Sequence, residues 1–403
     1  MARRGTNLPA VSQFNQAVVL DMIRRAPEGI SRSEIARQAG LSGQTASNAA
    51  RKLIDDGLVV ETGTRISGRG KPSVLLQLVG SSRYAIGVHL DPAFVTYVLM
   101  DLAGTTVLKH RSRTPSVADP STVVAEIAGS VRHLIDESSV DPDAIVGIGL
   151  AVPGPIDIDR GIIVDPPLLD GWSNVPLREE LAARTGLPVL MAKDVNAAVI
   201  AENWDAGSES GRDFLFCYYG SGVGMGISYR GDALVGVTGN AGNGGGLVVP
   251  AAGLPAKRRS DMLGHVAGAS YLVEQAREAG VLDPETDADR IVAFGELMRR
   301  ASEGDADAWM LVERASRNIA AALMGAVNLL DVNDIIFGGP YWTLLEPLAV
   351  PVIRRELASS PYLLTHSEVR ILPSRLGEEV VAIGAAVLTL DALYTPRSTS
   401  LLI

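Results

Sequence analysis

Residues 42–52 carry short polar and basic side chains that could hydrogen-bond to a nucleic acid. Short polar groups in the first turns of a helix can reach base edges in the major groove of DNA, and basic groups further along can bind phosphates. A basic, glycine-rich segment at 63–72 could place two cations in the narrow minor groove. The candidate DNA-binding residues are Ser42, Gln44, Thr45, Ser47, Asn48, Arg51, Lys52, Arg69 and Lys71.

Three predicted helices would position these side chains. Apolar residues at helical spacing predict the first helix over 11–25. Ser31 and Glu34 form a capping box that begins a short second helix. A turn containing a glycine follows, and Ser42 can cap a third helix that ends at about Asp56.

Two predicted strands, 58–62 and 73–78, flank the basic segment 63–72 and would make it a wing. Helix, turn, helix and wing in this order are typical of a winged helix-turn-helix DNA-binding domain. The alternative is a solvated hairpin on a helical module that binds protein.

The charge of the chain is uneven. The chain has 36 Lys and Arg against 46 Asp and Glu, and its formal net charge of −10 by itself argues against a nucleic-acid partner. Residues 1–79, however, hold eleven basic and six acidic side chains, which gives this segment +5 and the remainder −15. A small basic head on a large acidic body is expected if only the head contacts phosphate.

Length and composition exclude several classes of protein. At roughly 100 to 200 residues per domain, 403 residues predict about two to four domains. The 47% hydrophobic and 20% charged residues are typical of a soluble globular protein. The single cysteine, Cys217, excludes an intramolecular disulfide and a cysteine-cluster metal site. Because neither a signal peptide nor an apolar span of about 18 residues is evident, we expect a cytoplasmic protein.

The body is predicted to open with an α/β lobe. Strand-like runs at 84–90, 94–101 and 105–111 are joined by tight turns, a helix with an apolar face follows, and 145–152 is a buried strand. This order is that of the ribonuclease-H-like lobe of actin-like ATPases and sugar kinases. We expect an α/β protein with a winged helix-turn-helix at 1–80, a first ribonuclease-H-like lobe at 81–195, onto which a helix at about 380–395 packs back, and a second such lobe at 196–379.

Five motifs follow one another along the body. They are Val152-Pro153-Gly154-Pro155-Ile156-Asp157, Gly171-Trp172, Lys193-Asp194-Val195-Asn196-Ala197-Ala198, Gly220-Ser221-Gly222-Val223-Gly224 and Ile335-Ile336-Phe337-Gly338-Gly339. Their order and approximate spacing resemble the ROK family, named for repressors, open reading frames and kinases. With the winged head, residues 12–395 resemble the family's transcriptional regulators, which include bacterial repressors of xylose and N-acetylglucosamine metabolism. The resemblance implies operator DNA and a small sugar-related effector as partners, and a homo-oligomer, either a dimer or a tetramer.

Members of the family that use ATP carry an Asp-x-Gly-Gly-Thr turn for the phosphates. The corresponding residues here are His89-Leu90-Asp91-Pro92-Ala93. Asp91 would repel phosphates, and Pro92 has no amide proton to offer them. We therefore expect no cofactor and no enzymatic activity. The second glycine-rich loop, 220–224, matches the family pattern. It is either a turn retained for folding or evidence for the alternative function, an active sugar kinase with an accessory head.

In kinases of the family, the acid at the position of Asp194 removes a proton from the sugar hydroxyl. Without a phosphoryl donor, Asp194 is expected to be a vestigial base, and no residue is assigned a catalytic role. The preceding Asn, a sugar ligand in the family, is Lys193 here. Lys193 either pairs with Asp194 or another carboxylate, or binds an anionic effector such as a sugar acid or sugar phosphate. The expected effector site comprises Gly154, Lys193, Asp194 and Asn243. Because other family sugar contacts are replaced, a regulator without sugar response is a further alternative.

The zinc-binding cysteines of the family are absent from the corresponding segment, 253–263. No metal site is therefore expected. Lys257, Arg258 and Arg259 are expected to form a solvated basic loop, and contact of this loop with DNA or with an acidic surface stays open as an alternative. His265 lacks a second ligand at suitable spacing and is not expected to bind metal.

Overall fold

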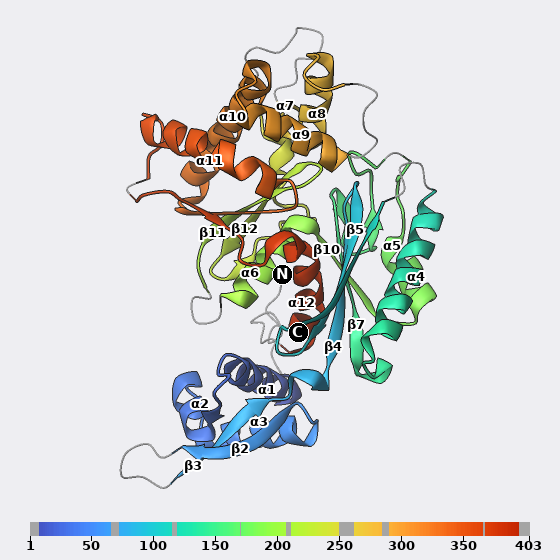
Figure 1. Cartoon of the computed structure of the whole chain (residues 1–403). Coiled ribbons are helices and arrows are strands. Elements are labelled where there is room, and N and C mark those ends of the chain that lie inside the picture. Colours follow the sequence, from blue (N-terminus) through green and yellow to red (C-terminus); the bar gives the residue numbers. More distant parts are fainter. Residues whose placement is uncertain are drawn as a thin grey trace.

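A computed structural model of the chain describes residues 8–65, 72–114, 119–169, 171–206, 211–249, 262–283, 290–365 and 367–394. It confirms the predicted fold class, with a winged helix-turn-helix head and a larger α/β body that contains two five-stranded sheets. The head lies at one end of the molecule and the second sheet of the body lies toward the other (Figure 1).

Three helices and a small sheet form the head. Strands β2 and β3 make an antiparallel hairpin and β1 pairs with β3, so the sheet order is β1-β3-β2. The predicted strand 58–62 continues to residue 65, and β1 is too short to show an alternating pattern in the sequence. Arg69 and Lys71 lie outside the described residues. The elements are α1 (Leu8–Arg24), β1 (Ile30–Ser31), α2 (Arg32–Ala39), α3 (Gly43–Asp55), β2 (Val59–Arg65) and β3 (Ser73–Leu78).

Local hydrogen bonds fix the ends of the head helices. The predicted capping box is present: the Ser31 amide donates to the Glu34 carboxylate at 2.9 Å, and the Ser31 hydroxyl accepts from the Glu34 amide at 3.3 Å. Gly40 ends α2 with a φ of 65°, in the left-handed region that favours glycine. The Ser42 hydroxyl accepts from the Thr45 amide at 3.1 Å and begins α3. These caps hold the turn between the two helices.

The first sheet of the body has the strand order β10-β7-β4-β5-β6. Its first three strands in the chain form an antiparallel meander, and β7 and β10 extend the sheet in parallel with β4. Helices α4 (Pro120–Ser138) and α5 (Leu177–Thr185) cover one face, and α12 (Val380–Tyr394) packs on the other (Figure 1). The strands are β4 (Tyr84–Leu90), β5 (Phe94–Asp101), β6 (Thr106–Arg113), β7 (Ile145–Val152) and β10 (Val189–Lys193).

The second sheet has the order β13-β12-β11-β14-β15, and helices α7 to α11 lie beyond it at the far end of the molecule (Figure 1). Its strands are β11 (Phe214–Tyr219), β12 (Val223–Tyr229), β13 (Asp232–Ala233), β14 (Asp334–Gly338) and β15 (Arg370–Pro373). The helices are α7 (Leu263–Ala267), α8 (Ala269–Glu278), α9 (Arg290–Ser302), α10 (Ala306–Leu330) and α11 (Trp342–Ser359). A separate pair of short strands, β8 (Ile156–Asp157) and β9 (Ile162–Ile163), follows β7.

Helix α6 (Asp194–Asp205) contacts strands of both sheets and packs along α12. Glycines permit close packing on both sides of α12: a Cβ on Gly149 of β7 would lie 1.7 Å from the carbonyl oxygen of Ala385 in α12, and one on Gly384 of α12 would lie 1.8 Å from that of Ala197 in α6. No other residue type could occupy either position without moving a helix. Helix α6 begins directly after β10, so its first residue lies at the carboxyl edge of the first sheet.

The apolar core of the head continues into the body, so the two parts share one buried cluster. Val19 and Ile23 of α1 belong to the same buried apolar cluster as Met100 of β5 and Leu390 of α12. The guanidinium of Arg24 lies 3.8 Å from the ring centroid of Trp204, near the end of α6. The head therefore contacts the body at β5, at α12 and at the end of α6.

Candidate DNA-binding surface and effector cleft

Helix α3 separates apolar and polar residues onto different faces. Its alanines at 46, 49 and 50 and Leu53 are buried against the head core. The polar residues predicted to bind DNA on this helix are exposed or half-buried. They are Ser42, Gln44, Thr45, Ser47, Asn48, Arg51 and Lys52. The structure thus brings seven of the nine predicted residues together on and around one helix, and the other two lie outside the described residues.

Several of these polar groups have partners within the head. Ser42 caps α3, the Gln44 amide donates to the Asn48 oxygen at 2.8 Å, and Lys52 pairs with Asp56 at 2.8 Å. The hydrogen bond to Asp56 raises the pKa of Lys52. Exposed pairs of this kind contribute little in water, so they leave the side chains able to bind another polar surface.

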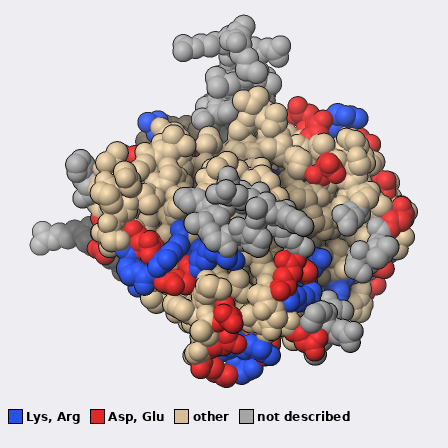
Figure 2. Space-filling view, turned by 90° about the horizontal axis from the view of Figure 1, so that it is seen from above, with Lys and Arg blue, Asp and Glu red and all other residues tan. Residues whose placement is uncertain are grey.

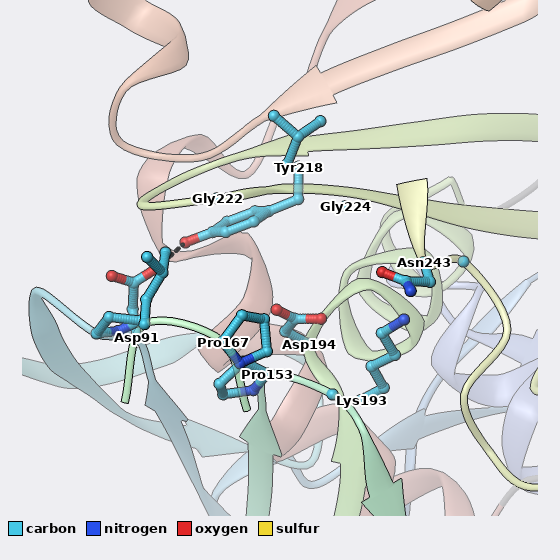
Figure 3. Close-up of a pocket in the computed structure, with 14 residues that line it drawn as sticks. Asp91, Pro153, Pro167, Lys193, Asp194, Tyr218, Gly222, Gly224 and Asn243 are labelled. Atoms are coloured by element: carbon cyan, nitrogen blue, oxygen red, sulfur yellow. Dashed lines mark hydrogen bonds between the residues drawn. The ribbon is translucent and has the colours of Figure 1, made fainter. Parts of the chain in front are cut away.

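A cleft with a cavity volume of about 90 Å³ lies where the two lobes of the body meet (Figure 3). Strands β4, β7 and β10 are parallel and end at this edge, which is where ligands bind to open α/β sheets. All four residues predicted for the effector site line the cleft. The full lining is Asp91, Pro92, Pro153, Gly154, Pro167, Leu168, Lys193, Asp194, Tyr218, Gly222, Val223, Gly224, Gly242 and Asn243.

Lys193 is the last residue of β10 and is only 6% exposed. Its ammonium donates to the carbonyl oxygens of Asn240 at 3.3 Å and Ala241 at 3.4 Å. Within the described parts of the chain, no carboxylate oxygen lies within 4.0 Å of this ammonium. Burial lowers the pKa of Lys193, while the charge of Asp194 acts in the opposite direction. Among the described residues, Lys193 therefore does not form an ion pair with Asp194 or another carboxylate, which was one of the two alternatives predicted for it.

Asp194 is the first residue of α6 and is partly exposed to the cleft. One carboxylate oxygen accepts a hydrogen bond of 2.7 Å from the Val195 amide. Burial raises the pKa of Asp194 to about 6, although Lys193 and the Val195 amide oppose this effect. The amino terminus of a helix favours a negative charge, and the group stays predominantly ionised at neutral pH.

Asp91 connects the two lobes across the cleft. Its carboxylate accepts hydrogen bonds from the Ser221 hydroxyl at 2.5 Å, the Ala93 amide at 2.9 Å and the Tyr218 hydroxyl at 3.4 Å. Burial raises the pKa of Asp91, and the hydrogen bond from Ser221 acts against this rise. A turn with a buried carboxylate and Pro92 does not fit a nucleotide phosphate, which needs backbone amides and no competing negative charge.

Sequence reasoning missed several residues that shape the cleft. Tyr218 precedes the glycine-rich loop and was not assigned a role, yet it contacts Asp91. Asn240 holds the segment after β7, because its side chain bonds both the amide and the carbonyl of Ile156 at 2.7 Å. The only signal for Asn240 was its position in the glycine-rich run 239–246. Neither contact is visible as a motif because the partners lie far apart in the chain.

The residues described by the structure show no group of three or more His, Cys, Asp or Glu side chains placed to hold a metal ion. The ring of His265 packs 4.6 Å from that of Tyr271. The predicted basic loop at 257–259 lies outside the described residues. None of the described helices has both the length and the apolar character needed to cross a membrane.

Two family patterns match separate parts of the sequence. That of the ROK family matches residues 85–392, which cover most of the body, and that of the MarR family matches residues 13–70 in the head. The chain belongs to the ROK family. The match in the head agrees with the winged arrangement of α2, α3 and the β2–β3 hairpin, so both predicted parts of the chain are recognised independently.

Relatives in the ROK family include regulators and kinases. The chain is 22% identical over 384 residues to the xylose repressor of Bacillus subtilis (strain 168), covering 94% of this chain and 96% of that protein. It is 27% identical over 313 residues to a glucokinase of Halalkalibacterium halodurans, covering 75% of this chain and 94% of the kinase. A crystal structure of a ROK-family transcriptional regulator, a homologue of the E. coli Mlc protein, covers 98% of this chain and 99% of its own with a TM-score of 0.76 and 23% identity. Both regulators therefore match nearly the whole chain.

Proposed function

We propose that this ROK-family protein is a DNA-binding transcriptional repressor of carbohydrate-related genes, with a kinase-like body that binds an effector and transfers no phosphate. The observation that carries this proposal is the combination of an exposed polar face on α3 with a phosphate turn occupied by Asp91 and Pro92. The xylose repressor, which matches the chain from head to body, supports the carbohydrate-related role.

The head supplies the DNA contacts in this proposal. Its net charge of +5 contrasts with the acidic body, and its polar helix is of the kind that enters a major groove. Seen from the end opposite the head, acidic and basic side chains are interspersed (Figure 2). Helices at that end carry paired charges, such as Arg299 with Glu296 and Arg317 with Glu313. In a homodimer, two heads would bind half-sites about 34 Å apart or a multiple of that spacing.

Contacts in the cleft support a body that transfers no phosphate. Asp91 places a carboxylate where an ATP-using relative needs amides, and the Ser221 hydroxyl of the glycine-rich loop is already bonded to it. Asp194 stands where a base would act, but a base without a phosphoryl donor transfers nothing. This cleft is proposed to bind the effector through Gly154, Lys193, Asp194 and Asn243.

Helix α6 offers a physical connection between effector and head. Asp194, its first residue, lines the cleft, and Trp204, near its last turn, contacts Arg24 of the head. An effector that binds more tightly to one arrangement of α6 would shift the population of head positions. Such coupling is typically worth about 1–3 kcal/mol.

The test uses the full-length protein and labelled DNA from the region upstream of its own gene, in mobility-shift assays at several salt concentrations. Affinity is expected to fall with salt, with a slope near about −0.9 per phosphate contacted. ATP turnover with a panel of hexoses and amino sugars is expected to stay at background. Binding that does not respond to salt would contradict the DNA assignment. Phosphorylation of any hexose would instead favour an active sugar kinase with an accessory head.

A further inference from the structure

Lys193 presents a buried cation to the cleft without an anionic partner among the described residues. We propose that its ammonium binds the carboxylate of a sugar acid, a polyhydroxy monocarboxylate, while Asp194 accepts hydrogen bonds from the hydroxyls of the same ligand. This inference rests on the proposed effector cleft and names the chemical class of its ligand.

Burial of the Lys193 ammonium is energetically costly. A charge removed from water is unfavourable unless it is paired and fully hydrogen-bonded. Lys193 is only 6% exposed. Its ammonium donates hydrogen bonds of 3.3 and 3.4 Å to two carbonyl oxygens, and these distances are long for a charged donor. The lowered pKa of Lys193 reflects the same poor solvation. An incoming anion would supply the missing partner.

The side chains around Lys193 limit the charge that a ligand can carry. Two carboxylates line the cleft with Lys193, so a dianionic phosphate would meet repulsion from both. Asp91 already accepts three hydrogen bonds, whereas Asp194 accepts one, from Val195. Asp194 therefore has lone pairs left for ligand hydroxyls. A ligand with one negative charge opposite Lys193 and with hydroxyls opposite Asp194 therefore matches the cleft best.

The positions of the charged side chains agree with this ligand class. Figure 3 shows Asp194 between Asp91 and Lys193, with the Lys193 ammonium on the side of the cleft where Asn243 lies. The cavity volume of about 90 Å³ is well below the roughly 300 Å³ of a small drug-sized site. It accommodates the carboxyl end of a ligand and the adjacent hydroxyl-bearing carbons.

The experiment compares wild type with Lys193→Met, which keeps a similar unbranched stem and removes the charge. Isothermal titration with D-glucuronate and D-gluconate is expected to show binding that is at least about ten-fold tighter than that of D-glucose or glucose 6-phosphate. Lys193→Met is expected to lose at least about ten-fold in affinity for the acids. Lys109→Met, an exposed lysine on β6 paired with Glu379 at 2.7 Å, serves as the matched control and keeps wild-type affinity.

A second measurement does not depend on the choice of ligand. Without any sugar, Lys193→Met is expected to raise Tm by about 2 °C or more, because it removes a buried charge without a partner. A lower Tm would show that the protein itself satisfies Lys193 and would overturn the proposal. So would failure of both acids to bind, equal binding of D-glucose, or tighter binding of glucose 6-phosphate. Mobility-shift assays with Lys193→Met distinguish failure of the ligand proposal from failure of the proposed function. DNA binding should persist in the variant even if neither acid binds to the cleft.

Discussion

The Ser221 hydroxyl donates a hydrogen bond of 2.5 Å to the carboxylate of Asp91, and both side chains are buried. Ser221 belongs to the glycine-rich loop between β11 and β12, whereas Asp91 follows β4 in the other lobe. The backbone of Asp91 is held as well, because its carbonyl accepts from the Thr114 hydroxyl at 2.7 Å. A protein carboxylate therefore ties the lobes together at the turn that corresponds to the Asp-x-Gly-Gly-Thr turn of the family members that use ATP.

Ser221→Ala is expected to destabilise the protein because it removes a donor from a buried carboxylate. Leaving a buried acceptor without one of its donors costs about 1–3 kcal/mol in the free energy of unfolding. Urea denaturation at neutral pH measures this difference. Ser121→Ala, an exposed serine in the first turn of α4, is the matched control and should stay within about 0.5 kcal/mol of wild type. Equal effects of the two substitutions would show that the Asp91–Ser221 bond contributes nothing.

Asp194→Asn is expected to change how stability depends on pH. Burial raises the pKa of Asp194 to about 6 from its usual 3.8, so the folded state favours the neutral carboxyl. Its contribution to stability is fully present below the unfolded value and is lost as the pH rises through 6. The asparagine variant lacks this loss and should gain about 1–2 kcal/mol relative to wild type between pH 4 and 7, less than the full shift because Asp194 is partly exposed. Denaturation at closely spaced pH values tests this, and parallel profiles would contradict it.

Local features of the head could be predicted because their partners are close in sequence. The Ser31–Glu34 capping box and the Ser42 cap connect residues three apart, so residue types alone specify them. Strands β4, β5 and β7 begin and end at the predicted residues, because their apolar runs are bounded by turns. The short strand β1 gave no such pattern.

Contacts that depend on the arrangement of the two lobes could not be predicted. Asp91 was expected to repel phosphate, but its bond to Ser221 joins residues 130 positions apart. The two alternatives for Lys193 were also undecided, because whether a lysine meets a carboxylate depends on the fold around it. The motifs singled out Gly154, Lys193 and Asp194, but strand β10 was not predicted. The parallel pairing of β7 with β10 in the structure brings these residues together at one edge of the sheet.

Substitutions on α3 are expected to separate base recognition from phosphate binding. Asn48→Ala removes an exposed amide of the type that reads adenine and should cost about 1–3 kcal/mol on the specific site, with little effect on unrelated DNA. Arg51→Ala should weaken binding to both and reduce the salt slope by about 0.9. Mobility shifts over a range of salt concentrations measure both quantities. Arg132→Ala, on α4 of the body, is the control expected to bind like wild type.

Trp204→Leu is expected to loosen the head from the body. The Arg24 guanidinium stacks on the Trp204 ring and donates to Asp21 at 2.9 Å, and burial lowers the pKa of Arg24. Within the described chain, Arg24 Nε and Trp204 Nε1 are buried without hydrogen-bond partners. These nitrogens would regain water if the head moved, so the joint is held by packing and by a cation–π contact worth about 0.5–2 kcal/mol.

Limited proteolysis measures this loosening, because cleavage between head and body requires the joint to open. Loss of the cation–π contact should raise the rate of that cleavage by about two-fold to thirty-fold, in proportion to the population of the open form. Trp309→Leu, a half-buried tryptophan on α10 in the second lobe, controls for the general cost of losing an indole. It should lower overall stability without selective cleavage next to the head. If both variants were cut alike, or neither faster than wild type, the Arg24–Trp204 contact would not be what holds the head in place, and α6 would lose its role as the connection to the cleft.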